Sequence, residues 1–389
     1  MELYEETVEA QQDQPVADPG LSSWLHLHLT AGVGPTIFRH LVDAFGSASA
    51  ALCAGRGTLA CVDGIGRVTA DRIASSRAEV DVANELELVS KHGISLLTWN
   101  SKGYPVGLKN IHDPPPVLYV EGRIEPADAT AIAVVGTRRP SRYGLEQAER
   151  FGAALARAGF TVVSGLASGV DSAAHTGALK AGGRTIAVQG CGLGRIFPPE
   201  NADLRLAIAQ QGAVLSEFPM LAEPLKENFP KRNRLISGMS LGVLVIEAPL
   251  RSGALTTART AGEQGREVFA LPGRADNQAA AGTNRLIKDG ACLVTCLEDI
   301  LDELGDVGRI MGEGTADADQ PPRAPVLPGN LTAAERAILA AAADEPMTVD
   351  EICATANLSP SQVSSALTML QLKGLIRPLA GARFLRVRR

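Results

Sequence analysis

The sequence is poor in aromatic residues and contains no long apolar segment. Phe, Trp and Tyr make up 4% of its 389 residues, so we do not expect a site built mainly on aromatic stacking. No uninterrupted apolar run approaches the roughly 18 residues that a transmembrane helix needs. The N-terminal segment MELYEETVEAQQDQ is acidic and polar and lacks the apolar stretch of a secretory signal. We therefore expect a cytoplasmic protein without a membrane partner.

Cysteine is scarce and scattered, with six residues and no CxxC pair. A disulfide framework or a structural zinc site would need a denser pattern. Cys292 and Cys296, in the segment CLVTC, have the spacing of residues on one face of a strand, and we interpret them as core residues. HExxH and EF-hand patterns are also missing. The sequence therefore predicts no metal site.

The glycine motifs of the common nucleotide cofactors are absent as well. A P-loop needs GxxxxGK[ST], which does not occur. A dinucleotide site needs GxGxxG after the first strand and an acidic residue about 20 residues later. Here the apolar run at 131–135 is followed by a single glycine, Gly136, and then by Thr137, Arg138 and Arg139. We predict a site that binds no cofactor and in which arginine supplies the charge.

The net charge of −6 argues against binding nucleic acid over the whole surface, but the charges are unevenly distributed. Thirteen Lys and Arg lie between residues 131 and 234, against eight Asp and Glu. The acidic residues concentrate in the first twenty residues and around 298–319. A basic zone within an acidic chain indicates a focused anion site.

Short β-rich segments alternate with helical segments between about residues 131 and 300. We predict strands at AIAVV, FTVV, RTIAV, AVLSE, VLVIE, EVFAL and CLVT. Helices are predicted at about 144–158, 170–181, 200–210, 230–239 and 254–265. This alternation predicts an α/β fold with a doubly wound, mostly parallel sheet whose two faces are both covered by helices.

Composition divides the chain into five parts. We expect a disordered tail at 1–20, a helical domain at 21–90, the α/β domain at 91–300, a flexible Gly/Asp/Pro-rich linker at 301–330 and a winged-helix domain at 331–389. The winged helix is predicted from three helical segments, with Thr332, Thr348 and Ser359 as N-caps, followed by a basic β-hairpin.

The helical domain contains two glycine turns, GVGP at 32–35 and DGIG at 63–66, and each leads into a helical segment. A helix-hairpin-helix, or a related SAM-like module, uses such turns to present backbone N–H groups to a phosphate. The same pattern also suits a small bundle that serves only for packing. Both interpretations remain open from the residues alone.

Small and basic residues follow nearly every predicted strand. Ligands bind beyond the carboxyl ends of the strands in open α/β sheets, and small residues allow close approach to the backbone. The candidate binding residues at these ends are Gly136, Thr137, Arg138, Arg139, Ser164, Gly165, Ala167, Gly169, Gly190 and Gly192. The basic segment FPKRNR adds Lys231, Arg232, Asn233 and Arg234. Several arginines along a groove suit a polyanion, although each could instead pair with Glu217, Glu227 or Glu247.

Asp171 and His175 are spaced i, i+4 on a predicted helix and could form either an acid/base pair or a structural pair. No nucleophile is identifiable beyond generic serines, so we predict no catalytic residue. Two alternative functions remain open: an enzyme that acts on a nucleotide through this pair, and a duplex-DNA regulator that acts through the winged helix.

Long motifs occur in a fixed order over about 130–290. They are VGTRRPSRYG, SGLASGVDSAAHTGAL, FPPENADL, FPKRNRLISGMS, VIEAPLRSGALTTARTAGEQGREVFALPG and GTNRLIKDGA. In these motifs the chain resembles the DprA/Smf family. The resemblance implies an extended Rossmann fold that binds and protects single-stranded DNA without catalysis and forms a homodimer through that domain. It also implies loading of the recombinase RecA in natural transformation. By the same resemblance Arg138 contacts the DNA backbone, and Ser164, Gly165 and FPKRNR line the same pocket.

Overall fold

The computed structural model describes residues 20–305, residue 307 and parts of 332–386. The described parts of the last segment are 332–341, 347–356, 358–359, 362–363, 366–367, 370, 376–379 and 383–386. The chain forms two compact units, Met1–Ala318 and Asp319–Arg389. Apart from Gly20, the expected tail lies outside the described residues, and so does most of the expected linker.

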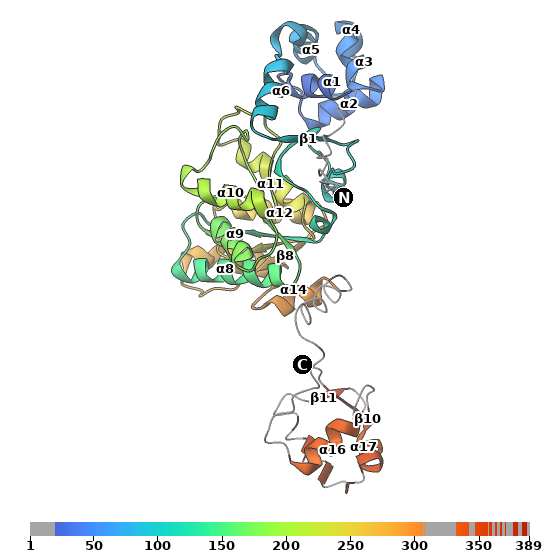
Figure 1. Ribbon diagram of the computed structural model, residues 1–389, viewed down its shortest axis with the longest axis vertical. Coiled ribbons are helices and arrows are strands. Elements are labelled where there is room, and N and C mark those ends of the chain that lie inside the picture. The colour runs from blue at the N-terminus through green and yellow to red at the C-terminus, as the bar shows by residue number, and fades with distance from the viewer. Residues whose placement is uncertain are drawn as a thin grey trace, which may run out of the picture. The chain divides into compact units, whose positions relative to one another are not determined.

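A sheet forms the centre of the first unit (Figure 1). It has nine strands in the order β1-β2-β6-β5-β4-β3-β7-β8-β9. The strands are β1 (Ser95–Thr98), β2 (Val117–Gly122), β3 (Ala131–Val135), β4 (Thr161–Ser164), β5 (Thr185–Val188), β6 (Ala213–Ser216), β7 (Gly242–Val245), β8 (Glu267–Ala270) and β9 (Cys292–Leu293). Strands β3 to β9 pair in parallel, and β1 and β2 are antiparallel at one edge. The predicted doubly wound, mostly parallel α/β fold is confirmed.

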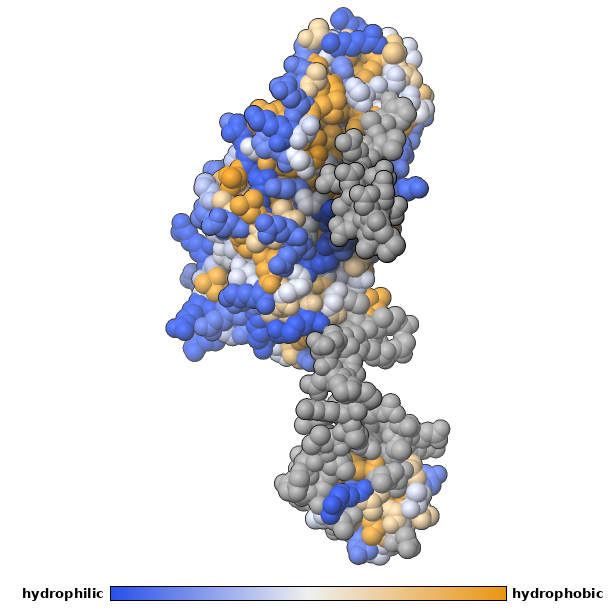
Figure 2. All heavy atoms as spheres, in the orientation of Figure 1, coloured by the Kyte–Doolittle hydropathy of each residue, from blue (hydrophilic) through white to orange (hydrophobic). Residues whose placement is uncertain are grey.

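Helices cover both faces of this sheet, which explains why its strands are almost continuously apolar. One face packs against α8 (Arg142–Arg157), α9 (Val170–Lys180) and α14 (Leu297–Glu303). The other packs against α11 (Asn228–Gly238) and α12 (Gly253–Glu263). Hydrophilic residues gather on the outer side of α8, at the lower left of Figure 2. The remaining helices of this region are α7 (Val106–Lys109), α10 (Ala202–Gln211) and α13 (Ala281–Lys288), with 3-10 turns at Pro126–Ala129, Pro199–Asn201 and Gln278–Ala280.

The direction in which successive strands are added to the sheet reverses between β3 and β7. From β3 it continues outward through β4, β5 and β6, and then returns to β7 on the opposite side of β3. Such a switch point opens a crevice between the loops that leave the two strands. The N–H of Thr137 donates to the carbonyl of Glu247 over 2.7 Å, which joins these loops at the carboxyl edge of the sheet.

Six helices precede the sheet, in the region where the sequence predicts a helical domain. They are α1 (Leu21–Leu29), α2 (Pro35–Phe45), α3 (Ala48–Cys53), α4 (Arg56–Leu59), α5 (Arg67–Glu79) and α6 (Val82–Lys91). The two glycine turns have positive φ, 87° at Gly32 and 77° at Gly64, which a side chain would disfavour. The helices share one apolar core with the β2 edge of the sheet, where the Trp24 indole donates to the Pro116 carbonyl over 2.7 Å.

The second unit contains α16 (Ala333–Ala341), α17 (Val349–Ala356) and a three-stranded sheet in the order β10-β12-β11. These strands are β10 (Met347–Thr348), β11 (Ile376–Leu379) and β12 (Arg383–Arg386), so the predicted hairpin is present. Thr332 and Thr348 accept hydrogen bonds from the N–H groups of Glu335 and Glu351, over 3.2 and 3.4 Å, which confirms both as N-caps.

The sequence interpretation was wrong where β9 meets α14. Strand β9 ends at Leu293, and Cys296 is the N-cap of α14 and not a strand residue. The reason is Asp299, whose carboxylate accepts the N–H groups of Thr295 and Cys296 over 2.6 and 3.1 Å and so starts a helix. This helix also occupies the first residues of the expected linker.

In the part of the chain that the structure describes, no His, Cys, Asp and Glu cluster could hold a metal ion. No helix there is both long enough and apolar enough to cross a membrane.

We predict that Tyr119→Phe lowers the free energy of unfolding by about 1–2 kcal/mol. The buried Tyr119 hydroxyl donates to Glu85 over 2.8 Å, and that carboxylate also accepts the N–H of Met220. The change leaves the Glu85 carboxylate buried with one fewer donor. Denaturant titration measures the loss, and Tyr143→Phe, on the exposed surface of α8, is the control that leaves stability unchanged. Equal stabilities of the two variants would contradict this account.

Candidate functional site

A groove of about 580 Å³ lies at the switch point, beyond the carboxyl ends of β3 and β7. We call it the cationic groove. Its walls come from the loop after β3, the loop before α9, helix α11 and the start of α12. The lining residues are Val135, Gly136, Thr137, Arg138, Arg139, Ala167, Asp171, Phe229, Arg232, Asn233, Ile236, Pro249, Arg251, Ser252, Gly253, Ala254, Thr257, Gln278 and Ala279.

Arg138 and Arg139 are exposed in this groove, and within the described segments neither forms an ion pair. The guanidinium carbon of Arg138 lies 4.9 Å from the centroid of the Phe229 ring. A cation–π contact of this kind contributes about 0.5–1 kcal/mol at an exposed site. Phe229 therefore restrains the Arg138 side chain without neutralising its charge.

Arg232 provides a buried charge to the same groove. Its side chain is only 4% exposed, and its Nε and Nη1 atoms have no hydrogen-bond partner among the residues described. Burial lowers the pKa of Arg232 to about 10, an effect that Asp171 opposes and Arg138 reinforces. The group therefore stays protonated at neutral pH. Two buried donors without partners are costly, and an anion in the groove would relieve that cost.

Asp171 holds the loop that precedes α9. Its carboxylate accepts the N–H groups of Gly165 and Ala167, over 3.1 and 3.4 Å. Burial raises the pKa of Asp171, and the nearby Arg232 opposes that rise. The carboxylate therefore has two tasks: it fixes the loop and it partly compensates the buried guanidinium.

His175 does not form a pair with Asp171. Its Nδ1 atom lies 2.6 Å from the hydroxyl of Thr185, and its side chain is completely buried. Burial, followed by the repulsion from Arg232, lowers the pKa of His175 to about 3. The imidazole is therefore neutral and inaccessible at neutral pH, so the structure gives no support to the acid/base pair that the spacing allowed.

Arg234, for which the sequence predicts a phosphate contact, has carboxylate partners in the structure. This guanidinium is buried and forms ion pairs with Glu217 and, over 3.1 Å, with Asp113. On a helix, residues two apart are rotated by roughly 200° about the axis, so their side chains point to nearly opposite sides. Arg232 therefore faces the groove while Arg234 holds α11 to the neighbouring loops.

The other residues predicted from the sequence fall into three groups. Those that line the cationic groove are Gly136, Thr137, Arg138, Arg139, Ala167, Arg232 and Asn233. Gly165 and Gly190 line a smaller adjoining cavity. Ser164, Gly169, Gly192 and Lys231 line neither.

Three of that last group have structural explanations. The buried Ser164 hydroxyl donates to the carbonyl of Val134 over 2.6 Å, within the sheet. A side chain at Gly192 would collide with the carbonyls of Pro219 and Met220. Gly169 has a φ of 91° and lies against the backbone of Arg138, so its conformation and its close approach both require glycine.

The smaller cavity has a volume of about 280 Å³, and we call it the side chamber. Its lining residues are Arg138, Gly165, Leu166, Ala167, Ser168, Gln189, Gly190, Phe197, Pro198, Pro199, Glu200, Phe229 and Arg232. It shares Arg138, Ala167, Phe229 and Arg232 with the cationic groove, so the two cavities meet at these side chains.

Sequence reasoning missed several lining residues, chiefly Phe197, Gln189 and Arg251, and included Phe229 only as the first residue of the segment FPKRNR. Phe197 and Phe229 each precede a proline, and their rings lie 5.8 Å apart at 43°. The only signal available was that both occur in motifs next to predicted site residues. The low aromatic content of the chain favours a site without aromatic residues.

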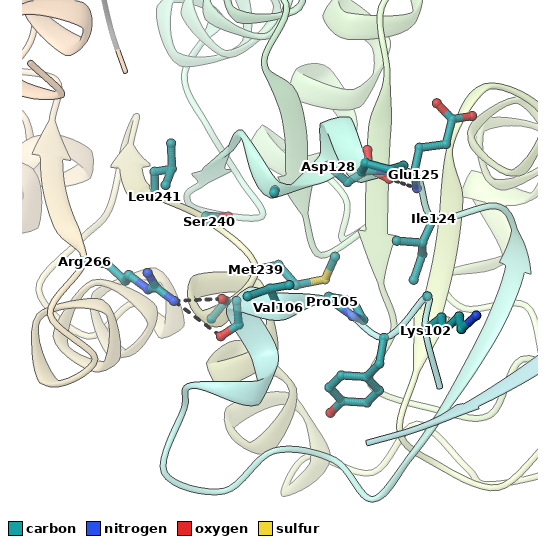
Figure 3. Close-up of a pocket in the computed structure, with 16 residues that line it drawn as sticks. Lys102, Pro105, Val106, Ile124, Glu125, Asp128, Met239, Ser240, Leu241 and Arg266 are labelled. Carbon is teal, nitrogen blue, oxygen red and sulfur yellow. Dashed lines mark hydrogen bonds between the residues drawn. The ribbon is translucent and has the colours of Figure 1, made fainter. Parts of the chain in front are cut away.

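A third cavity, of about 300 Å³, has a different character (Figure 3). Its walls include the apolar side chains of Val106, Ile124 and Met239. The Arg266 side chain points toward it and donates to the carbonyls of Gly107 and Gly238, over 3.4 and 3.3 Å (Figure 3). That guanidinium therefore ties two backbone segments together, and we do not consider this cavity the anion site.

Comparison with known proteins finds three family models that match parts of this chain. The family model of DNA recombination-mediator protein A matches residues 95–305, that of a DprA-like N-terminal HHH domain matches 20–54, and that of a DprA winged helix domain matches 319–382. Protein Smf from Synechocystis is 36% identical over 93% of this chain and 98% of that protein. Protein Smf from Escherichia coli is 42% identical over 76% of this chain and 78% of that protein.

The X-ray structure of DNA processing protein A from Streptococcus pneumoniae superposes with a TM-score of 0.65 and 33% sequence identity. The superposition covers 72% of this chain and 97% of that one.

We predict that Gly165→Ala lowers the free energy of unfolding by about 1–3 kcal/mol, as overpacking does elsewhere. A methyl group at this position would overlap the guanidinium of Arg232, which would have to leave its buried position. Gly262→Ala, on α12, is the matched control because nothing lies within 4 Å of its methyl group. Denaturant titration compares the two, and a Gly165→Ala protein as stable as the control would contradict the packing described here.

We predict that His175 remains neutral until the pH approaches about 3. Below a pH of about 6.5 the unfolded chain binds a proton at this residue while the folded chain does not, so folding stability falls as the pH falls from 6.5 toward 3. The ring nitrogen chemical shifts of His175, followed by NMR during an acid titration, report its protonation. A midpoint near 6.5 would show that the imidazole is accessible and would revive the acid/base hypothesis.

Proposed function

Because the chain belongs to the DNA recombination-mediator protein A family, we propose that it binds single-stranded DNA in the cationic groove and acts in DNA recombination without catalysing a reaction. The observation that carries this proposal is Arg232, a buried guanidinium whose two unpartnered donors lie at the wall of a groove lined by further arginines.

The phosphates of the strand would contact the arginines of the groove. Arg138 and Arg139 are exposed and free of carboxylates among the described residues, and Arg251 also lines the groove. Arginine forks bind phosphate oxygens through two parallel hydrogen bonds. The proposed contact residues are Gly136, Thr137, Arg138, Arg139, Gly165, Ala167, Gly190, Lys231, Arg232 and Asn233, with Ser164, Gly169 and Gly192 holding the backbone that surrounds them.

The aromatic residues favour a single strand over a duplex. Phe229 lies between the cationic groove and the side chamber, and Phe197 packs beside it. A base can stack on a phenylalanine ring only if it is free of its own stack, which is the situation in single-stranded DNA. Proteins of this kind combine a basic channel with such aromatic platforms and show little sequence preference.

Several further properties belong to this proposal. The relative from Streptococcus pneumoniae, 43% identical over 51% of this chain, bears the name DNA processing protein DprA. We propose that this chain likewise processes DNA, protects incoming strands in natural transformation and loads RecA on them.

We also propose that it forms a homodimer through the α/β domain and acts in the cytoplasm. Light scattering of the purified protein tests the dimer.

The two alternative functions receive different support. The enzyme hypothesis needs Asp171 and His175 to act together, and each has other partners. The duplex-regulator hypothesis depends on the winged helix. Deletion of residues 320–389 tests it, because we expect most of the affinity for single-stranded DNA to survive.

We predict that Arg138→Ala weakens binding of a short single-stranded oligonucleotide by about tenfold or more, the effect of losing a charge-assisted hydrogen bond. The matched control is Arg142→Ala, whose side chain is exposed on α8 and pairs with Glu146 over 2.9 Å. Fluorescence anisotropy measures both affinities, and thermal unfolding shows that both variants fold. Equal affinities of the two variants would refute the proposed site.

A further inference from the structure

Glu247 is a buried acidic residue next to the cationic groove that the proposed phosphate contacts do not explain. It lies just after β7, and its side chain is 2% exposed. The sequence allowed the arginines of the groove to pair with it, but within the described residues it forms no ion pair. A carboxylate near an anion site opposes the binding of phosphate. Its presence there therefore needs another reason.

Glu247 holds both ends of the short segment that carries the two exposed arginines. At one end its backbone carbonyl accepts the N–H of Thr137 over 2.7 Å. At the other end its carboxylate accepts the N–H and the hydroxyl of Ser141, over 2.8 and 2.6 Å. Only residues 138–140, with both arginines, lie between these anchors. The segment 137–141, which we call the arginine loop, is therefore fixed to the end of β7.

The start of α8 explains how this buried carboxylate is tolerated. Ser141 is the N-cap of α8, and its hydroxyl oxygen also accepts the N–H of Gly144 over 3.1 Å. Negative charge is favourable at a helix N-terminus, where backbone N–H groups lack partners within the helix. A side chain at position 144 would collide with the Glu247 carboxylate, so the glycine leaves space for it. The carboxylate is held in one position, and the arginine loop with it.

We propose that Glu247 is a positioning residue for the DNA site: it orders the arginine loop, so that Arg138 and Arg139 are already in place when the phosphates arrive. This inference rests on the proposed function. An ordered loop binds more tightly because the entropy of ordering it is not lost on binding.

Positioning and charge predict opposite effects when Glu247 is removed. Loss of a negative charge by itself strengthens the binding of phosphate. Loss of the anchor weakens binding, because the strand must then order the arginine loop. The direction of the change in affinity therefore separates the two effects.

The test measures the affinity of three variants for a short single-stranded oligonucleotide by fluorescence anisotropy. Glu247→Ala removes both the charge and the side-chain anchor. Glu247→Gln removes the charge but keeps an acceptor for the N–H of Ser141 and a donor for its hydroxyl oxygen. Ser141→Ala removes the hydroxyl contact and leaves the charge in place.

Glu85→Ala is the matched control. Glu85 is also buried, and its carboxylate accepts one hydroxyl and one backbone N–H, from Tyr119 and Met220. It belongs to α6 and lines neither the cationic groove nor the side chamber. Its loss therefore shows how far destabilisation alone changes the affinity. Thermal unfolding identifies the temperatures at which every variant is folded, and the affinities are measured there.

We expect Glu247→Ala and Ser141→Ala to weaken binding by about 2- to 10-fold, the range of one net hydrogen bond. Glu247→Gln should bind at least as tightly as the wild type, and Glu85→Ala should bind like the wild type. If Glu247→Ala does not fold, Ser141→Ala decides the question.

Three results would overturn the inference and leave the proposed function intact. They are undiminished affinity in Ser141→Ala and in any folded Glu247→Ala, a Glu247→Gln protein that binds more weakly than the wild type, and an equal loss of affinity in Glu85→Ala. Failure of the wild type to bind the oligonucleotide at all would overturn the proposed function itself.

A second measurement separates the ordering of the loop from general damage to the fold. In a protein that carries Arg138→Ala and Arg139→Ala, the loop has no arginine to position, so Glu247→Ala should not weaken binding further at low salt. Equal weakening in both backgrounds would make Glu247 merely structural and overturn the inference. Hydrogen exchange reports the anchor directly: the Ser141 amide should exchange faster in Glu247→Ala than in the wild type, and an unchanged rate would contradict the anchor.

Discussion

The site depends on one buried charge that its own fold does not fully compensate. Arg232 is enclosed at the carboxyl end of a parallel sheet, where burial lowers its pKa to about 10 but leaves it charged. Asp171 is the nearest compensation, yet that carboxylate also accepts two backbone N–H groups of the loop before α9. Arg138 adds a second positive charge. The arrangement is favourable only when an anion joins it, which ties the stability of the site to its ligand.

The architecture explains how such a charge is held in place. The switch point between β3 and β7 opens the crevice, and Gly165 gives the guanidinium the space that a side chain would occupy. Two arginines of α11 lie on opposite sides of the helix. Arg232 faces the groove, while Arg234 forms buried ion pairs with Asp113 and Glu217. The ion-paired arginine thus fixes the helix that carries the arginine available for binding.

The sequence predicted the fold well because alternation of apolar strands and helical segments is a strong, local signal. It also placed the basic residues at the correct edge of the sheet, since strand ends are readable from composition. It could not distinguish Arg232 from Arg234, because both belong to one basic segment and only the rotation of α11 separates them. The spacing of Asp171 and His175 suggested a pair. In the structure Asp171 instead accepts hydrogen bonds from loop amides, and His175 is hydrogen-bonded to Thr185. Cys296 was misassigned because Asp299 starts a helix there.

The most direct test of the central claim is the salt dependence of binding to a short single strand, for the wild type and for an Arg232→Met variant. If Arg138, Arg139 and Arg232 each neutralise a phosphate, the logarithm of the affinity falls with the logarithm of the salt concentration with a slope of about 2, and the variant loses about 0.7 of that slope. A wild-type affinity that does not change with salt, or a variant with the same affinity and slope as the wild type, would contradict the account.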